Sequence, residues 1–266
     1  MAEGDSILRM ARRMDAALTG KPVSVRTPGR RRPEGLAPSS LDGLVIERVE
    51  SRGKHLLLHF EDDLTLHSHL GMHGGWHLYR PGQRWRRSPS QAWICLAADD
   101  AEAVNFGGSF VRIGRRRRLL RDPRLVRLGP DILAAEPDLD RMLGNFRRGD
   151  PSRQVGDVLT DQRIVAGIGN VWKAESLWHA RVSPWRRVGD VADRELREVL
   201  ETAARLMRRS VETGREEVNI SRRAGMPCPR CATLVRSRGQ GDDNRTAYWC
   251  PTCQPGPEPP AHPAPS

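Results

Sequence analysis

Two short motifs, CPRC at residues 228–231 and CPTC at residues 250–253, decide the fold of the C-terminal part of this chain. Two such knuckles, eighteen residues apart, are typical of a zinc ribbon in which four thiolates hold one structural Zn²⁺ and leave no position for substrate. A pair of disulfides or a redox motif is the alternative. Because the chain opens without a signal-peptide pattern and Cys95 is its only other cysteine, we favour zinc. The predicted ligands are Cys228, Cys231, Cys250 and Cys253.

The segment between the knuckles is predicted to form a hairpin. Its tip, around Arg236–Arg245, is rich in arginine and suited to approach phosphate. After Gln254 the chain is rich in proline up to Ser266, and we expect a disordered tail there.

The sequence before the knuckles indicates helices. Along 190–213 the apolar side chains fall on one face, and Gly214 supplies a stop. Two shorter helices are predicted at about 153–163 and 170–180, and Ala166–Gly169 must form the turn between them.

The first half of the chain indicates one helix followed by a β-rich domain. Residues 5–18 carry apolar side chains at helical spacing, and the segment 28–40, rich in Pro, Arg and Ser, is predicted to be a loop. Glu61–Asp63 is a tight hairpin signal between two strands. Several short strands at this spacing favour a β-sandwich or barrel. The predicted strands are Leu44–Val49, His55–Phe60, Leu64–Leu70, Trp76–Tyr79, Ala92–Ala97 and Ala103–Phe106.

The charge of the chain indicates a polyanionic partner. Its 266 residues carry 44 Lys and Arg against 33 Asp and Glu, a formal net charge of +11. Such a protein binds polyanions because the displacement of counterions from phosphates is favourable whatever the sequence. No run approaches the ~18 apolar residues of a membrane span, so we expect no membrane partner and a cytoplasmic location. Only three cations are lysines, and a lysine can supply a compact amine with a tunable pKa; they are Lys21, Lys54 and Lys173.

Six histidines crowd two of the predicted hairpins, at His55, His59, His67, His69, His73 and His77. His67 and His69 fall on one face of a strand, as chelation would require. However, no carboxylate or thiolate stands at a suitable spacing, so we predict no second metal site.

Five segments, in order along the chain, resemble the formamidopyrimidine/endonuclease VIII (Fpg/Nei) family of DNA glycosylases with apurinic/apyrimidinic lyase activity. The opening, MAEGD, is similar to the family's Met-Pro-Glu-Gly, and the last segment resembles its terminal zinc finger. Five ordered segments are far more specific than any one of them. The segments are Met1–Asp5, Ser51–His55, His69–Gly74, Leu159–Glu175 and Arg245–Gln254.

This resemblance implies an α+β multidomain fold. It combines an N-terminal helix plus β-sandwich, a helical domain with a helix–two-turn–helix motif, and a C-terminal zinc ribbon finger. We expect the N-terminal catalytic β-sandwich domain at 1–127, the helical domain at 128–224, the zinc finger at 225–254 and the disordered Pro-rich tail at 255–266. We expect a monomer.

The resemblance also implies a catalytic amine. Once Met1 is removed, the α-amine of Ala2 would attack C1′ of the damaged nucleotide, and Glu3 would shuttle protons to the sugar oxygen and the imine. Near pH 7.5 roughly a quarter to a third of α-amines are neutral, against about a thousandth of lysines, because their pKa values are about 7.7–8.0 and 10.4. Lys54 would lie beside the lesion phosphate and sugar.

Three more residues are expected to bind DNA by the same resemblance. Met72 would fill the gap left by a flipped base, because an unbranched apolar side chain can replace the lost stacking. Asn170, at the start of a helix, would hold a phosphate together with backbone amides. Arg245 would fork across another phosphate and complete the catalytic set.

Ala2 stands where the family has proline. The secondary amine of proline gives an iminium that keeps its charge, whereas Ala2 gives an imine that must be protonated to draw electrons. This predicts slower elimination or a greater dependence on Glu3. Lys54 is the alternative nucleophile if burial or neighbouring cations lower its pKa.

Two departures favour the endonuclease VIII branch, and hence oxidised pyrimidines and abasic sites. The formamidopyrimidine branch has Asn-Asp-Pro-Arg-Arg-Phe with an arginine facing the orphaned base, whereas Asn105–Phe110 reads NFGGSF. The segment between Gly214 and Cys228 is also too short for the long base-capping loop of that branch.

The leading hypothesis is therefore an enzyme that removes an oxidised base from double-stranded DNA and cleaves the abasic site by β- or β,δ-elimination. Single-stranded or bubble DNA is an alternative substrate, and an 8-oxoguanine/formamidopyrimidine-type glycosylase is an alternative activity. A non-catalytic binder of damaged or abasic DNA is the competing class, which Ala2 would permit. A zinc-ribbon transcription factor explains the cysteines and the charge but not Glu3 and Lys54.

Overall fold

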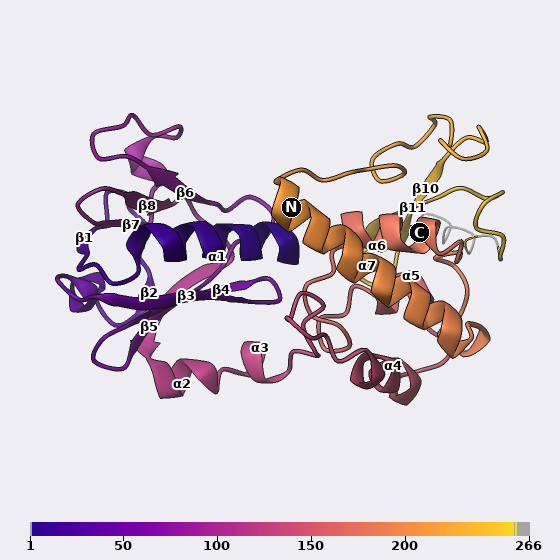
Figure 1. Cartoon of the computed structure of the whole chain (residues 1–266), viewed down its shortest axis with the longest axis horizontal. Helices are drawn as coiled ribbons and strands as arrows, with labels where there is room; N and C mark the ends of the chain where they lie inside the picture. Colours follow the sequence, from indigo (N-terminus) through magenta and orange to yellow (C-terminus); the bar gives the residue numbers. More distant parts are fainter. Residues whose placement is uncertain (1, 258, 260–266) are drawn as a thin grey trace, which may run out of the picture. The chain divides into compact units, whose positions relative to one another are not determined.

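The structure is a computed structural model that describes residues 2–257 and 259. By its internal contacts the chain divides into two compact units, Met1–Arg127 and Leu128–Ser266, which are described one at a time (Figure 1). Most of the expected disordered tail, residues 258 and 260–266, lies outside the described residues. None of the described helices is long and apolar enough to cross a membrane.

Helix α1 (Gly4–Leu18) and two β-sheets build the first unit around one apolar core. The helix was predicted at 5–18, and it buries Ile7 and Met14 in this core at helical spacing. Leu58 from one sheet and Leu96 from the other contribute to the same core. The β-sandwich prediction is therefore confirmed.

The larger sheet has the strand order β2-β9-β5-β4-β3, and the smaller sheet has the order β1-β7-β8-β6. The strands are β1 (Ser24–Arg26), β2 (Glu34–Gly35), β3 (Ile46–Arg52), β4 (His55–Phe60), β5 (Leu64–His69), β6 (Trp76–Tyr79), β7 (Ile94–Ala97), β8 (Glu102–Asn105) and β9 (Phe110–Arg115). The six predicted strands are found as β3–β8, with ends shifted by up to three residues. The turn at Asp62 and Asp63 is also confirmed, because both residues adopt the positive φ values, 56° and 58°, that a two-residue hairpin needs.

Three strands of the first unit, β1, β2 and β9, were not predicted. β2 lies in the segment 28–40, for which the loop prediction was wrong in part, since it also holds a short 3₁₀ helix, Pro38–Leu41. β9 was missed because its apolar positions, Phe110, Val111 and Ile113, form no clear alternation and are followed by glycine and a run of arginines. Tertiary pairing with β5 decides its conformation.

The second unit contains the predicted long helix as α7 (Asp193–Thr213), which ends at Gly214 with a φ of 72°. The other helices are α4 (Leu139–Arg148), α5 (Val155–Val158) and α6 (Asn170–His179). The helix predicted at 153–163 was too long, because only α5 is helical. The Thr160 hydroxyl donates to the Asp157 carbonyl at 3.0 Å, and the Arg163 N–H donates to the Asp161 carboxylate at 3.1 Å. Such local bonds compete with a helix and replace it with turns.

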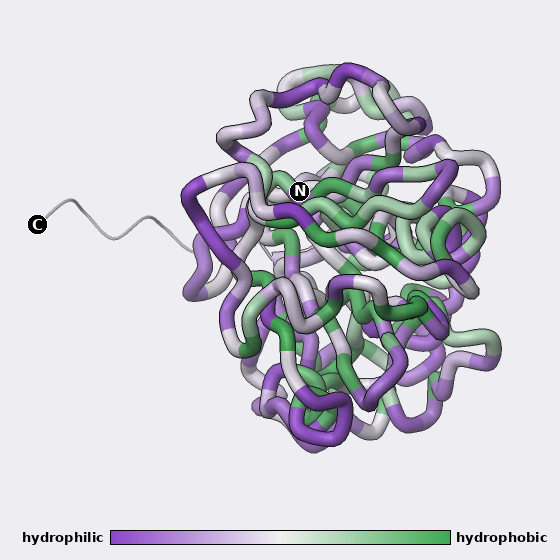
Figure 2. The backbone as a smooth tube through the Cα atoms, turned by 90° about the vertical axis from the view of Figure 1, so that its left-hand side faces the viewer, coloured by the Kyte–Doolittle hydropathy of each residue, from purple (hydrophilic) through white to green (hydrophobic). Residues whose placement is uncertain are grey.

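The cysteine hairpin, β10 (Arg236–Gln240) and β11 (Arg245–Trp249), belongs to the second unit. Two contacts anchor it to the helical part. Trp249 packs edge-on against Trp185, with 5.2 Å between ring centroids, and the Gln254 amide donates to the Val182 carbonyl at 2.9 Å. Figure 2 follows hydropathy along the backbone, with hydrophobic stretches separated by hydrophilic turns.

Candidate functional site

The beginning of α1 holds the first candidate pair, Ala2 and Glu3. The Glu3 N–H donates to Ser6 Oγ at 3.1 Å, and the Ser6 hydroxyl donates back to the Glu3 carbonyl at 2.8 Å. Ala2 packs against the core of the unit, and the Glu3 residue is 2% exposed. Because the positive end of the helix dipole favours a carboxylate, Glu3 suits this position. Ala2 thus lies against the core, next to a buried acid whose backbone Ser6 holds at the start of α1.

α1 runs alongside β3 and β4, and this sets where its first residues lie (Figure 1). The Val49 N–H of β3 donates to Asp15 at 2.8 Å, and Thr19 forms a bridge with Ile46. The end of the helix therefore lies at the start of β3. Its beginning points toward the other end of β3, where the strand turns into β4.

Lys54 occupies that turn. Arg52 pairs with His55 across it, and Gly53 adopts a φ of 56° that favours glycine. The Lys54 side chain is half-buried, and its charge is among the factors that lower the pKa of His69, after burial of the imidazole. The first unit therefore brings Ala2, Glu3 and Lys54, three of the predicted site residues, to the same end.

Three histidines next to Lys54 form a cluster that the sequence analysis considered only as metal ligands. His55 Nδ1 and His67 Nε2 share a hydrogen bond of 2.9 Å, and the His55 and His69 rings lie 4.8 Å apart between centroids. Burial lowers the pKa of His55 to about 2 and that of His67 to about 4, so both are neutral near pH 7. The register of the β4–β5 hairpin, which pairs His55 with His69, was the signal that could have located this cluster.

Met72 lies in the loop after β5 and is 66% exposed. Gly71 adopts a φ of 61°, and a Cβ on it would come within 2.6 Å of Ser109 Oγ, so the loop packs tightly against that segment. The Gly74 N–H closes the loop by donating to the Leu70 carbonyl at 3.0 Å. A large apolar side chain is therefore presented to solvent from a tight loop.

The four predicted cysteine ligands come together in the second unit. Their Sγ atoms all lie within 4.8 Å of one another, and Cys231 and Cys250 are 3.4 Å apart. Zn–S bonds of about 2.3 Å in a tetrahedron place sulfurs about 3.8 Å apart, which matches this spacing. All four are free cysteines, so the disulfide alternative is not found. These residues can hold one metal ion.

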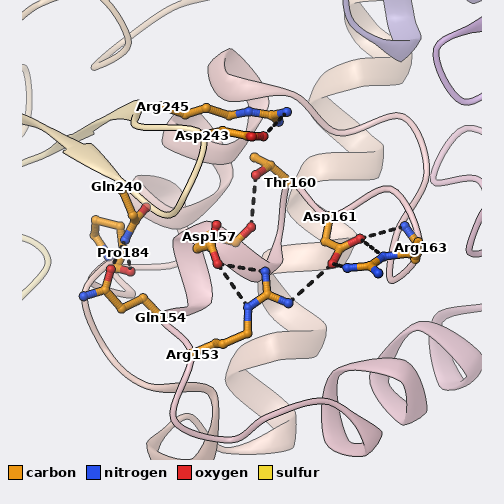
Figure 3. Close-up of polar contacts among 10 residues, drawn as sticks. All are labelled: Arg153, Gln154, Asp157, Thr160, Asp161, Arg163, Pro184, Gln240, Asp243 and Arg245. Carbon is orange, nitrogen blue, oxygen red and sulfur yellow. Dashed lines mark hydrogen bonds and ion pairs between the residues drawn. The ribbon is translucent and has the colours of Figure 1, made fainter.

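Arg245 begins β11, at the turn of the cysteine hairpin (Figure 3). Its Nη2 lies 2.8 Å from Asp243 Oδ2. The hairpin tip is less basic than predicted, because the turn itself carries Asp242 and Asp243. Together with the 153–163 segment, the tip encloses a pocket of about 260 Å³ that Arg153 and Gln162 also line.

The floor of this pocket is an ion-pair network within the 153–163 segment (Figure 3). Arg153 bridges Asp157 at 2.7 Å and Asp161 at 3.4 Å, and Arg163 contacts Asp161 at 2.7 Å. The hydrogen bond from Arg163, together with these cations, lowers the pKa of Asp161 to about 2. Gly241 of the hairpin sits so close to Asp157 that a Cβ would approach its Oδ1 to 2.2 Å. The network therefore supports the hairpin that carries Arg245.

Asn170 begins α6, after the glycine-rich turn that the sequence predicted. The Gln162 carboxamide holds this turn closed by donating to the Ile168 carbonyl at 2.9 Å and accepting from the Gly167 N–H at 3.0 Å. The carboxamide oxygen of Asn170 is buried and has no hydrogen-bond partner among the described residues. Asn170 does not line the pocket at Arg245, although both belong to the second unit.

Comparisons with known proteins agree over most of the chain. A model of the formamidopyrimidine-DNA glycosylase N-terminal domain matches residues 1–110, and a model of the formamidopyrimidine-DNA glycosylase H2TH domain matches residues 128–222. A probable endonuclease 8 2 of Streptomyces coelicolor is 41% identical over 97% of this chain and 96% of its own length. The DNA-(apurinic or apyrimidinic site) lyase Nei2 of Mycolicibacterium smegmatis is 32% identical over 96% of this chain and 99% of its own.

The fold has a solved counterpart. The Lactococcus lactis Fpg, in a complex with DNA containing an abasic site, superimposes with a TM-score of 0.82 over 96% of this chain and 100% of that chain. The two sequences are 18% identical, so this likeness concerns the fold.

Proposed function

Since the chain belongs to the formamidopyrimidine-DNA glycosylase family, we propose that it is a base-excision-repair DNA glycosylase and abasic-site lyase. Relatives named endonuclease 8 and the NFGGSF segment favour oxidised pyrimidines as substrates. Its partner is double-stranded DNA with an oxidised base or an abasic site, bound by a monomer in the cytoplasm. Strand cleavage follows by β- or β,δ-elimination.

The single observation that carries this proposal is Ala2 packed against the core beside the buried Glu3. After loss of Met1, the amine of Ala2 bonds to C1′ while the glycosidic bond breaks and the base leaves. The sugar ring opens as its oxygen accepts a proton from Glu3, and the amine loses a proton to give an imine. A base then removes the C2′ proton of the protonated imine, a C2′–C3′ double bond forms, and the 3′ phosphate leaves with the electrons of the C3′–O bond.

The other site residues position the DNA. Lys54, on its two-residue turn, is suited to the phosphate and sugar at the lesion. The exposed Met72 is suited to enter the gap left by the flipped base. Asn170 and Arg245 are suited to hold backbone phosphates, which position a duplex without reading its sequence.

The metal in this proposal is one Zn²⁺ on Cys228, Cys231, Cys250 and Cys253. The thiolate set and its spacing fit a closed structural site. The ion would stabilise the hairpin that carries Arg245 and would take no part in the reaction.

The test compares wild-type protein with Glu3→Gln on two duplexes, one with a single oxidised pyrimidine and one with a preformed abasic site. We expect wild-type protein to cleave both and to leave an undamaged duplex intact. Glu3→Gln should slow base removal more than cleavage of the abasic duplex, where the difficult glycosidic bond is already broken. Tight binding of both damaged duplexes by wild-type protein, without release of a base or a nick, would instead establish the non-catalytic binder.

A further inference from the structure

An arginine-rich segment joins the two parts of the chain that the family models match. Residues 111–127 fall between those matches, and 115–118 are four consecutive arginines. In the structure this segment forms the end of β9 and two short helices, α2 (Arg116–Leu120) and α3 (Pro123–Val126). The proposed function uses none of these arginines.

α2 is fixed to the sheet by its first residue and by one apolar side chain. The Arg116 N–H donates to the Asp63 carbonyl at 2.6 Å, and its guanidinium donates to the Phe60 carbonyl at 2.6 Å and pairs with Glu47. Leu119 is buried against the sheet beside Gly114. The helix is therefore anchored and presents its other side chains in fixed directions.

Three arginines of this segment, Arg117, Arg118 and Arg121, are exposed and line one open groove of about 1250 Å³ between α2 and β2. Spacings of three and four residues place Arg121 on the same helical face as the other two. By contrast, Arg112 in the same groove contacts Asp122 at 2.9 Å and Glu34 at 3.1 Å. Within the part of the chain that the structure describes, none of the three has a carboxylate within ion-pair distance. We call Arg117, Arg118 and Arg121 the α2 surface.

The start of α2, with Arg117 and Arg118, lies at the opposite end of the sheet from Lys54. The segment then runs back along β9, because Asp122 contacts Arg112. Phe110, at the start of β9, pairs with His69, whereas Arg115, at its end, pairs with Leu64. Six residues of strand span roughly 17 Å. Lys54 is next to the His69 end, because its neighbour His55 pairs with His69. The phosphates held at Lys54 are therefore not the ones that Arg117 and Arg118 contact.

We propose that the α2 surface is a second nucleic-acid-binding site, which holds the backbone phosphates of a DNA segment other than the one at the lesion. Guanidinium groups match the geometry of a phosphate, and their desolvation costs little free energy because they are weakly hydrated. Three like charges on one helical face repel one another, and a polyanion relieves that repulsion while it releases its own counterions. An open groove lined by arginines from a short, anchored helix suits a phosphate backbone rather than a small apolar ligand.

The test measures binding of undamaged duplex DNA as a function of salt. Each phosphate contact contributes about 0.9 to the slope of log affinity against log salt concentration. The variant Arg117→Gln/Arg118→Gln/Arg121→Gln should therefore lower that slope by two to three units. Arg12→Gln/Arg13→Gln, on the exposed face of α1, is the control for loss of charge and should change the slope by well under one unit.

A second measurement separates the two sites. Borohydride first joins the protein to a short abasic duplex, so that the proposed catalytic site is filled, and binding of a second, undamaged duplex is then titrated. We expect the wild-type adduct to bind the second duplex and the triple variant to form the adduct normally but bind the second duplex at least tenfold more weakly. An adduct that forms but gives equal second-duplex binding in both proteins, or an unchanged salt slope in the triple variant, overturns the α2 surface. Absence of any adduct instead contradicts the proposed catalysis, and the salt slope of the free protein still tests the α2 surface.

Discussion

Arg245 is paired with Asp243, two residues earlier in the same hairpin, with 2.8 Å between Nη2 and Oδ2. The Asp243 carboxylate accepts from a guanidinium N–H of Arg245 that could otherwise donate to a DNA phosphate. Because the two side chains are 35% and 72% exposed, the pair contributes less than about 1 kcal/mol. We therefore predict that Asp243→Asn raises the affinity for duplex DNA about two- to fivefold, as measured by fluorescence anisotropy at fixed salt.

Asp242→Asn is the matched control, since it removes the same charge from the adjacent position and no ion pair joins Asp242 to Arg245 among the described contacts. Its effect should be smaller than that of Asp243→Asn. Equal gains from both variants would mean that only the net charge of the turn matters and that Asp243 does not compete with phosphate.

Arg245→Ala should weaken binding to damaged and undamaged duplexes alike, and it should lower the salt slope by about one unit. Asn170→Ala should likewise weaken binding to both duplexes, because Asn170 is also proposed to contact a phosphate of the DNA backbone rather than a base. Affinity measured on both duplexes at several salt concentrations tests this. A change confined to the preference for one base would show that the phosphate roles are wrong.

Metal removal should affect the second unit and leave the first unit folded. We predict one tightly bound zinc per chain by elemental analysis, with Cys250→Ser releasing it. That variant should bind the abasic duplex much more weakly, since the hairpin carrying Arg245 would no longer be held, while the β-sandwich of residues 2–127 keeps its thermal transition. Protein purified without chelator that contains no zinc would contradict the site.

The sequence was most informative where a local pattern decides the structure. The apolar face of α7 and its end at Gly214 could be predicted from neighbouring residues, and so could the turn at Asp62–Asp63. The spacing of the cysteines likewise predicted that all four would come together. Long-range contacts were not predictable in the same way. β9 owes its conformation to its neighbour β5, and no pattern around Arg245 indicates its pairing with Asp243.

Within the site, too, local patterns could be predicted from the sequence and long-range contacts could not. Glu3 and Lys54 were identified by resemblance, and the order of α1 and β3 then places them at one end of the unit. The hydrogen bond between His55 and His67 depends on the register of β4 against β5, which hydropathy alone does not reveal.

The buried histidines predict a pH dependence of stability. Burial lowers the pKa of His55 to about 2 and that of His67 to about 4, against about 6.5 in an unfolded chain. Below pH 6.5 the unfolded state therefore binds more protons, so the free energy of unfolding falls as the pH drops from 6.5 toward 4. Between pH 7.5 and 5 the loss should be roughly 2 kcal/mol for each histidine.

Denaturant unfolding of the full chain at these two pH values measures that loss. His55→Gln/His67→Gln should reduce the difference between the two free energies, whereas His73→Gln, at an exposed position, should leave it unchanged. An identical pH dependence in wild-type protein and the double variant would show that other groups cause it.

The most direct test of the central claim is borohydride trapping on abasic DNA, followed by mass spectrometry of the peptide that carries the adduct. The amine of Ala2 is predicted to be the nucleophile, so the adduct should map to the N-terminal peptide and disappear when the terminus is acetylated or retains Met1. Ala2→Pro should keep trapping and speed elimination, because its iminium charge is permanent, while Lys54→Ala should cleave less but still trap. If acetylated protein traps normally and Lys54→Ala does not, Lys54 is the nucleophile and the role assigned to Ala2 is wrong.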